Sequence, residues 1–183
     1  MGPKIPPFPP REFATIDEVL AGGAPGHSLD DSVTERGIAL PGERAEHPGK
    51  VYIVGGGPGA VDLLTLRAVR ALGEADVVLL DHLAPQEYSE YAPNALIVDV
   101  GKVPGKHAVP QSRIQQLMID YALSGKTVVR LKGGDPYVYG RGAEELDACI
   151  AAGLEAEVIP GITSAIAVPG RAGIPVTLRR VSS

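Results

Sequence analysis

Cysteine and long apolar runs are scarce in this sequence, and each absence excludes a class of protein. Cys149 is the only cysteine among 183 residues, so an intrachain disulfide is impossible, and we expect a reducing, cytoplasmic location. The apolar runs have the length of strands and fall short of the roughly 20 residues of a membrane-spanning helix, so we expect no membrane association. His and Cys never pair with the spacing of metal ligands, so we expect no metal.

Positive charge is also limited, and most of the net negative charge lies in one segment. The net charge is -5, and the first 48 residues hold four Lys and Arg against eight Asp and Glu. The remainder is therefore nearly neutral. Proteins that bind nucleic acid usually present a broad basic face, so we expect no nucleic-acid partner.

Proline and glycine are concentrated at the start of the chain, in stretches such as MGPKIPPFPP and LPGERAEHPGK. This composition buries too little apolar surface to offset the entropy lost on ordering. We therefore predict a mostly disordered leader over residues 1–48, with one short helical segment at 13–21. The compact domain is expected to begin at residue 49.

From residue 50 onward, short β-branched apolar runs alternate with amphipathic stretches, which is typical of an α/β protein. Nearly continuous apolar runs indicate strands that are buried on both faces, joined by right-handed crossovers. We predict a mainly parallel five-stranded sheet with helices on both faces. The expected strands are 51–54, 76–80, 95–100, 127–131 and 156–159, and the expected helices are 62–73, 110–123, 141–152 and a short one after Thr163.

Unusual loops follow the expected strands, at the edge where ligands bind in this architecture. The first loop, GGGPGA, has the G-x-G-x-x-[G/A] spacing of a dinucleotide site through Gly55, Gly57 and Ala60. Asp81, at the end of the second strand, could be the ribose-binding acid of such a site. Pro58 weakens this interpretation because it removes a backbone N–H group that a pyrophosphate needs. A dinucleotide-binding module stays open as one hypothesis.

The loop after the fourth strand, KGGDPYVYGRG, presents a carboxylate beside accessible backbone. Gly133 and Gly134 permit close approach of a ligand, and Pro136 stiffens the turn that carries Asp135. This arrangement suits an amino-acid-like or cationic ligand. An Asp-Pro turn that caps the next helix is the structural alternative.

Basic residues gather in two of these loops. GKVPGKHAVPQSR carries Lys102, Lys106, His107 and Arg113 without an acidic residue, and YGRG adds Arg141. Cations beside a strand-end cleft suit an anion with several carboxylates, which Arg binds through two hydrogen bonds. A solvated basic loop would have the same composition, so charge alone leaves both interpretations open.

Several loops together resemble one family. They are VGGGPGAVDLLTLRAVRALGEADVVLLDHL, VGKVPGKHAVPQSRI, VVRLKGGDPYVYGRGAEEL and VIPGITSAIAVPGRAGIPVT. From about residue 50 to 180 the chain is similar to the N-terminal domain of the uroporphyrinogen-III C-methyltransferases, within the tetrapyrrole methylase family. The specific part is RLKGGDPYVYGRG together with VGKVPGKHAVPQ, because other members share the glycine loops without this combination.

The resemblance implies a methyltransferase that uses S-adenosylmethionine as its methyl donor. Members with these motifs transfer two methyl groups to carbons 2 and 7 of uroporphyrinogen III and form precorrin-2, which leads to sirohaem and cobalamin. The family forms homodimers, so uroporphyrinogen III and a second copy are the expected partners. Another precorrin methyltransferase of the family is the nearest alternative, and the VGKVPGKHAVPQ loop argues against it.

The resemblance also implies roles for residues that match its motifs. Asp81 is implied as proton acceptor and Lys102 as proton donor, while Arg141 and Glu144 are implied in holding the tetrapyrrole. Removal of a proton from the methylated macrocycle suits a carboxylate, although Asp81 could instead be a capping aspartate at a strand end. The residues implied in contacting S-adenosylmethionine are Pro58, Gly133, Gly134, Asp135, Val138, Thr163 and Ser164.

The chain departs from the family pattern at two places. Ala60 and Val61 stand where the family usually has an acidic residue and proline, and this difference is expected to change how the first helix starts. After the α/β domain at 49–178, residues 179–183 are expected to begin a linker to a second domain. In the family that domain completes the donor site with a methionine and a glycine, so the sequence predicts a truncated enzyme with weak or absent activity of its own.

Overall fold

Parallel strands form one central sheet in this computed structural model, which describes residues 14–15, 41–81, 83–84, 86–101 and 110–179. Within those ranges the sheet has six strands in the order β1-β4-β3-β5-β2-β6, and every neighbouring pair is parallel. The strands are β1 (Ala14–Thr15), β2 (Lys50–Gly55), β3 (Val77–Leu80), β4 (Leu96–Asp99), β5 (Val128–Lys132) and β6 (Glu155–Ile159).

The five expected strands are confirmed as β2 to β6, and each boundary differs from the prediction by at most one residue. β1 was not expected, because its two residues fall in the segment predicted as helical. Ala14 pairs with Val98 of β4, whose other edge is paired with β3. An open strand edge offers unpaired N–H and C=O groups, which explains why an extended segment can bind there.

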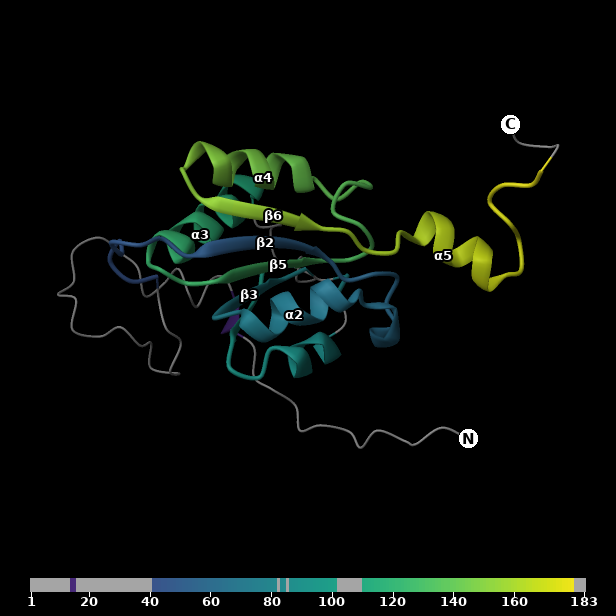
Figure 1. Ribbon diagram of the computed structural model, residues 1–183, viewed down its shortest axis with the longest axis horizontal. Coiled ribbons are helices and arrows are strands. Elements are labelled where there is room, and N and C mark those ends of the chain that lie inside the picture. Colours follow the sequence, from purple (N-terminus) through teal and green to yellow (C-terminus); the bar gives the residue numbers. More distant parts are fainter. Residues whose placement is uncertain (1–13, 16–40, 82, 85, 102–109, 180–183) are drawn as a thin grey trace.

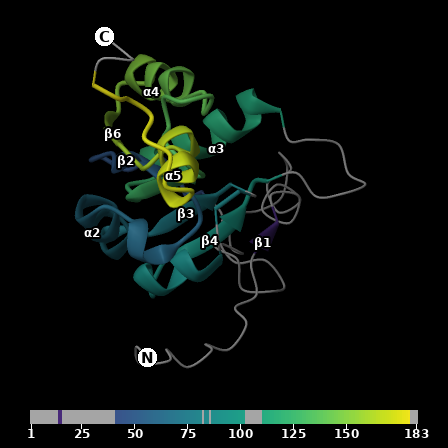
Figure 2. The ribbon, with the colours of Figure 1, turned by 90° about the vertical axis from the view of Figure 1, so that its right-hand side faces the viewer.

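Helices cover both faces of the sheet, as predicted (Figure 2). One face packs against α2 (Leu66–Glu74) and the 3-10 helix η2 (Gln86–Tyr91), and their core includes Leu72 and Tyr88. The other face packs against α3 (Gln111–Leu123) and α4 (Gly142–Ala151), with Met118 and Cys149 in its core. The elements that carry the candidate residues are therefore fixed by two separate apolar layers.

The first expected helix begins later than predicted. Residues Val61–Leu63 form a short 3-10 helix, η1, and α2 begins at Leu66. Thr65 defines this start because its side-chain oxygen accepts a hydrogen bond from the Ala68 N–H group at 3.1 Å. The stretch after the first glycine loop is consequently a turn.

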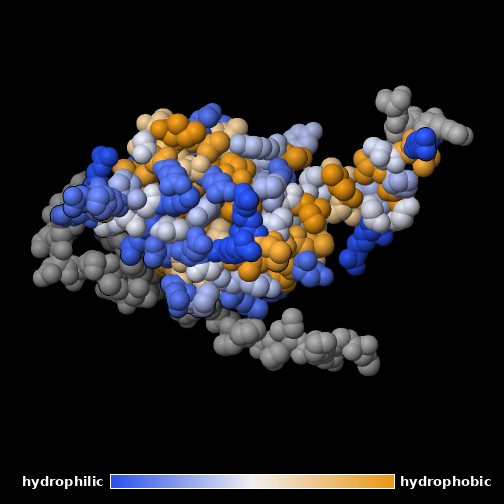
Figure 3. Space-filling model, in the orientation of Figure 1, coloured by the Kyte–Doolittle hydropathy of each residue, from blue (hydrophilic) through white to orange (hydrophobic). Residues whose placement is uncertain are grey.

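α5 (Ser164–Arg171) lies beyond the carboxyl ends of the strands and projects from the body of the sheet (Figure 1). None of its residues is buried. Apolar side chains remain exposed along α5 and the segment after it, as Figure 3 shows: Ile166, Val168, Ile174, Val176 and Leu178. No helix in the described part of the chain is long and apolar enough to cross a membrane.

The end of the predicted leader is attached to α3. The Ala45 N–H group donates to the Leu123 carbonyl at 2.8 Å, and the Gly49 N–H group donates to the Ala122 carbonyl at 2.7 Å. Apart from β1 and residues 41–48, the leader lies outside the described residues, so its predicted disorder stays a prediction.

Candidate functional site

Three glycine loops meet at the carboxyl edge of the sheet. Gly56 donates its N–H to the Lys132 carbonyl at 2.7 Å, and Gly57 and Gly134 exchange hydrogen bonds of 3.1 and 2.7 Å. The loop after β6 joins them through Gly161. This arrangement brings together the first, fourth and fifth strand-end loops that the sequence singled out.

Glycine is required in these loops because their backbones are in contact. A Cβ atom on Gly161 would lie 2.3 Å from the Gly134 carbonyl oxygen, and one on Gly55 would lie 2.5 Å from the Gly161 nitrogen. Both neighbours are backbone atoms and cannot rotate aside. The glycines thus serve to join three loops, in addition to any approach of a ligand.

The geometry contradicts the dinucleotide interpretation of the first loop. A pyrophosphate needs free N–H groups at the start of a helix, but those of Gly56 and Gly57 donate to the carbonyls of Lys132, at the end of β5, and of Gly134. The next α-helix begins only at Leu66. Tyr88 adds a further constraint, because its hydroxyl donates to the Gly56 carbonyl.

Asp135 links two of the loops through both of its carboxylate oxygens. Oδ1 accepts from the Tyr137 N–H group at 2.8 Å, and Oδ2 accepts from the Gly161 N–H group at 3.1 Å. The helix-capping alternative is wrong, because α4 begins only at Gly142 and its N-cap is Arg141. Asp135 shapes the edge on which a donor would lie.

The other residues implied in donor binding surround this junction. Pro58 follows the Gly57–Gly134 bridge and is exposed, and Val138 is 40% exposed. A Cβ on Gly134 would meet only the Thr163 Cα, at 4.0 Å, so open space adjoins the Gly134 backbone. Thr163 is also the N-cap of α5, and Ser164 is the first residue of that helix. Exposed backbone beside a carboxylate fits an amino-acid-like ligand such as S-adenosylmethionine.

Asp81 follows β3 at the same edge and is held by a buried arginine that sequence reasoning missed. Its N–H group donates to the Leu131 carbonyl at 2.9 Å, and its Oδ2 lies 3.1 Å from Nη2 of Arg130. Arg130 is only 3% exposed. The proposed proton acceptor is therefore anchored from both its backbone and its side chain.

Arg130 belongs to a cluster of buried charges. Its Nε lies 3.1 Å from Oε1 of Glu145, and Lys132 Nζ lies 3.1 Å from Oε2 of the same carboxylate. Burial, followed by the nearby Arg130 charge, lowers the pKa of Lys132. One signal could have revealed this cluster: Arg130 lies inside a strand predicted to be buried on both faces and Lys132 directly follows it, and buried charge is costly unless paired.

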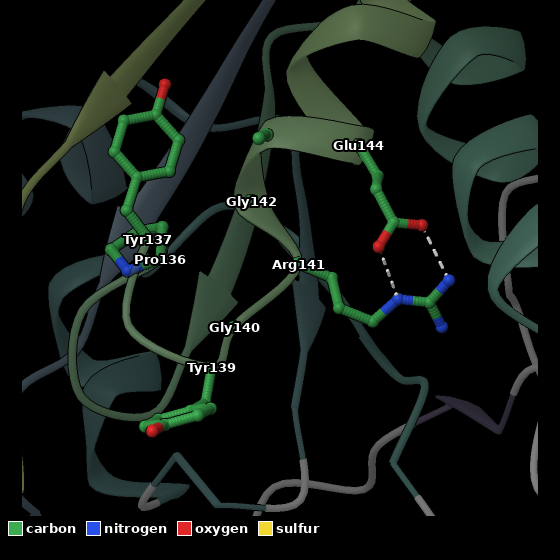
Figure 4. Close-up of a pocket in the computed structure, with 8 residues that line it drawn as sticks. Pro136, Tyr137, Tyr139, Gly140, Arg141, Gly142 and Glu144 are labelled. Atoms are coloured by element: carbon green, nitrogen blue, oxygen red, sulfur yellow. Dashed lines mark hydrogen bonds and ion pairs between the residues drawn. The ribbon is translucent and has the colours of Figure 1, made fainter.

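A hollow of about 400 Å³ lies in the loop between β5 and α4. Arg141 and Glu144, the residues implied in tetrapyrrole binding, both line it and form a bidentate ion pair of 2.9 and 2.6 Å (Figure 4). The hydrogen bond from Arg141 lowers the pKa of the Glu144 carboxyl. Tyr139 and Arg141 both have a φ of 56°, a conformation that is costly for residues other than glycine and is often found at functional sites.

The remaining basic residues are only partly described. Lys102, Lys106 and His107 lie outside the described residues, while Arg113 is exposed on the first turn of α3. The proton donor predicted from the resemblance therefore stays a prediction. In the part of the chain that the structure covers, no group of three or more His, Cys, Asp or Glu residues could hold a metal.

The sequence pattern of one family, Tetrapyrrole (Corrin/Porphyrin) Methylases, matches residues 50–183. The chain belongs to this family. The predicted tetrapyrrole methylase membership is thus confirmed, and the match begins with β2, the strand that carries the first glycine loop.

Individual members of the tetrapyrrole methylase family agree with this assignment. An S-adenosyl-L-methionine-dependent uroporphyrinogen III methyltransferase of Methanosarcina barkeri is 51% identical over 136 residues, which are 74% of this chain and 53% of that protein. A sirohaem synthase of Klebsiella pneumoniae is 50% identical over 132 residues, which are 72% of this chain and 28% of that one.

A solved structure confirms the α/β fold. Uroporphyrin-III C-methyltransferase of Thermus thermophilus, complexed with S-adenosylhomocysteine, has a TM-score of 0.59 and 42% identity to this chain. The similarity covers 73% of this chain and 52% of the Thermus chain. This chain spans about half the length of the curated relatives that it matches: the matched residues cover 57% of the first and 53% of the second.

Proposed function

We propose that this chain takes part in the methylation of uroporphyrinogen III at carbons 2 and 7, with S-adenosylmethionine as methyl donor, to form precorrin-2 for sirohaem and cobalamin. The observation that carries the proposal is the junction of three glycine loops beside Asp135, in a member of the tetrapyrrole methylase family. The identity of 51% to a methyltransferase with this substrate supports it.

The glycine junction is proposed as one wall of the donor site. Pro58, Gly134 and Asp135 lie on adjoining loops, and Val138 with Thr163 flanks them. Because Asp135 already accepts two backbone hydrogen bonds, its role toward the donor includes holding the Gly161 loop in place. Alignment of donor and acceptor is the main requirement of an in-line displacement at a sulfonium.

Asp81 is proposed as the base. The ring carbon forms a bond to the methyl group while the carbon–sulfur bond breaks and its electron pair stays on sulfur. The positive charge that develops on the macrocycle is relieved when a proton leaves, and a carboxylate can accept that proton. The Asp81 side chain is 31% exposed, so a substrate can reach it. Lys102 is proposed as proton donor from its motif alone.

Arg141 and Glu144 are proposed to bind the tetrapyrrole, whose acid side chains suit an arginine fork. Their present ion pair is exposed, with 55% and 53% of the two side chains accessible. An exposed pair contributes little to stability, so Arg141 can exchange Glu144 for a substrate carboxylate at small cost. We further propose a cytoplasmic enzyme and, by analogy with the family, a homodimer.

Calorimetry and a methylation assay test this function. The chain is titrated with S-adenosylhomocysteine and with NAD, and then incubated with uroporphyrinogen III and S-adenosylmethionine labelled with ¹³C at the methyl group. We expect binding of S-adenosylhomocysteine, none of NAD, and enriched methyl signals at carbons 2 and 7. Asp81→Asn should bind S-adenosylhomocysteine normally and lose about 10²-fold or more in turnover.

Asp147→Asn is the matched control, because it removes one carboxylate charge from the exposed surface of α4. It should leave binding and turnover unchanged. Binding of NAD without S-adenosylhomocysteine would contradict the proposal. Methylation of a later corrinoid precursor, with none of uroporphyrinogen III, would favour another member of the family. Normal turnover in Asp81→Asn would reject Asp81 as the base.

A further inference from the structure

The buried charges on β5 lie on one face of a central strand. Arg130 and Lys132 are two residues apart, so both side chains point toward the face that α3 and α4 cover. Both contact Glu145 of α4, which is fully buried. A buried charge without a partner strongly destabilises a protein, so these three groups pair with one another. Arg130 also contacts Asp81 and thereby connects the buried charges to the candidate site.

All three nitrogens of the Arg130 guanidinium donate hydrogen bonds. Nε donates to Glu145 at 3.1 Å, Nη1 donates to the Leu79 carbonyl at 3.2 Å, and Nη2 donates to Asp81 at 3.1 Å. Leu79 is also the residue paired with Arg130 across the sheet, and Asp81 lies two residues further along the same chain. The orientation of the guanidinium is therefore fixed at the point where it reaches the sheet edge.

Glu145 fixes the other end of this arrangement. Its Oε1 accepts hydrogen bonds from Arg130 Nε, from Gln111 Nε2 at 2.9 Å and from Lys132 Nζ at 3.2 Å. The ammonium group of Lys132 also lies 3.1 Å from Oε2 as an ion pair. The carboxylate thus joins α3, α4 and β5. It also directly follows Glu144, one of the residues proposed to bind the tetrapyrrole.

We propose that Arg130, anchored by Glu145, is the positioning residue that sets the direction of the Asp81 carboxylate at the carboxyl edge of the sheet. The effect of this role on turnover rests on the proposed function. The Arg130–Asp81 contact itself does not, because it is present in the folded chain. In this role Arg130 acts through Asp81 and does not itself touch the reacting atoms.

Lysine cannot replace arginine in this role. Arginine presents donors in a planar fork, whereas lysine carries a single ammonium group. In Arg130→Lys the buried Glu145 carboxylate keeps a cation as its partner, while Asp81 loses the Nη2 hydrogen bond. The substitution therefore separates positioning of Asp81 from neutralisation of the buried carboxylate.

The contact can be measured without catalysis. In protein with ¹³C-labelled aspartate, the carboxyl resonance of Asp81 is assigned from its loss in Asp81→Asn. At a fixed neutral pH, Arg130→Lys should shift this resonance. Arg67→Lys, which alters an exposed pair with Glu157 at the surface, should leave it in place. An unshifted Asp81 resonance in folded Arg130→Lys overturns the proposal.

Turnover tests the consequence of the contact. A misplaced group commonly costs about 10²-fold, so Arg130→Lys should lower kcat by about that factor. Its KM for uroporphyrinogen III and its affinity for S-adenosylhomocysteine should stay within about twofold of wild type. Because Arg130 acts through Asp81, the double variant with Asp81→Asn should be no slower than Asp81→Asn alone. Independent, additive losses would overturn the proposal.

The two measurements keep this inference distinct from the proposed function. If the wild-type chain methylates nothing, the proposed function fails, and the Asp81 resonance still decides whether Arg130 holds this carboxylate. If Arg130→Lys does not fold, the reciprocal change is used: Asp81→Asn should shift the guanidinium ¹⁵N resonances of Arg130. Unchanged ¹⁵N resonances would reject the contact.

Discussion

Gly161 shows how single residues shape this site. There is no room for a side chain at this position. A Cβ atom would lie 2.3 Å from the Gly134 carbonyl oxygen and 2.7 Å from the Gly55 carbonyl carbon and oxygen. Asp135 accepts the hydrogen bond of the Gly161 N–H group. A side chain at this position would have to separate two loops that carry the residues proposed to bind the donor.

We expect Gly161→Ala to destabilise the protein by about 1–3 kcal/mol, as overpacking against backbone does. Urea unfolding measures this loss, and calorimetry should show weaker binding of S-adenosylhomocysteine. Gly170→Ala is the matched control, because a Cβ at this position of α5 would meet no atom within 4 Å beyond its own helix backbone and chain neighbours, and alanine favours a helix. Equal stabilities of the two variants would contradict the packing seen at Gly161.

At the scale of elements, α2 depends on how it begins. The helix that covers one face of the sheet starts after a 3-10 turn, and Leu72 buries its side chain completely. Apolar spacing alone predicted an earlier start, because periodicity does not reveal which residue supplies the cap. The Thr65 hydroxyl decides this boundary.

Thr65→Ala should lower the free energy of unfolding by about 1 kcal/mol, since the Ala68 N–H group loses its acceptor. Thr65→Ser keeps the oxygen and should retain most of the stability. Chemical denaturation of the three proteins measures the difference. A loss in Thr65→Ser as large as that in Thr65→Ala would show that the methyl group, and not the cap, matters.

At the scale of the whole molecule, the apolar layer between the sheet and α3 with α4 couples stability to pH. Cys149 lies fully buried in this layer, and burial raises the pKa of its thiol to about 11 from the ordinary value of 9.0. The folded state therefore favours the neutral thiol. Its contribution is complete below pH 9.0 and is lost as pH rises toward 11.

We expect the wild type to lose about 1 kcal/mol more stability between pH 8 and pH 10 than Cys149→Ala does. Cys149→Ala is less stable at both pH values but lacks this thiol contribution. Urea unfolding at the two pH values measures both slopes. Tyrosines and lysines titrate in both proteins, so the comparison isolates the thiol. Parallel slopes would show that Cys149 does not couple stability to pH.

Much of the architecture and the glycine loops could be read from the sequence. Continuous β-branched runs indicated β2 to β6, because strands buried on both faces must be apolar along their whole length. The motifs around Gly133 and Asp135 indicated the family, which the match over residues 50–183 confirmed. These features depend on residues that are contiguous in the sequence, so they can be recognised without the structure.

Only the tertiary structure revealed how the site is held together. The contacts of Gly161 with Gly134, and of Arg130 with Asp81, join residues that are 27 and 49 positions apart, across neighbouring loops and strands. The periodicity of apolar residues does not indicate which distant residues form such pairs. The sequence by itself determined the fold class and the residues of the loops. The tertiary structure decided which backbone atoms touch and which buried charges share a partner, because both depend on the packing of strands distant in the chain.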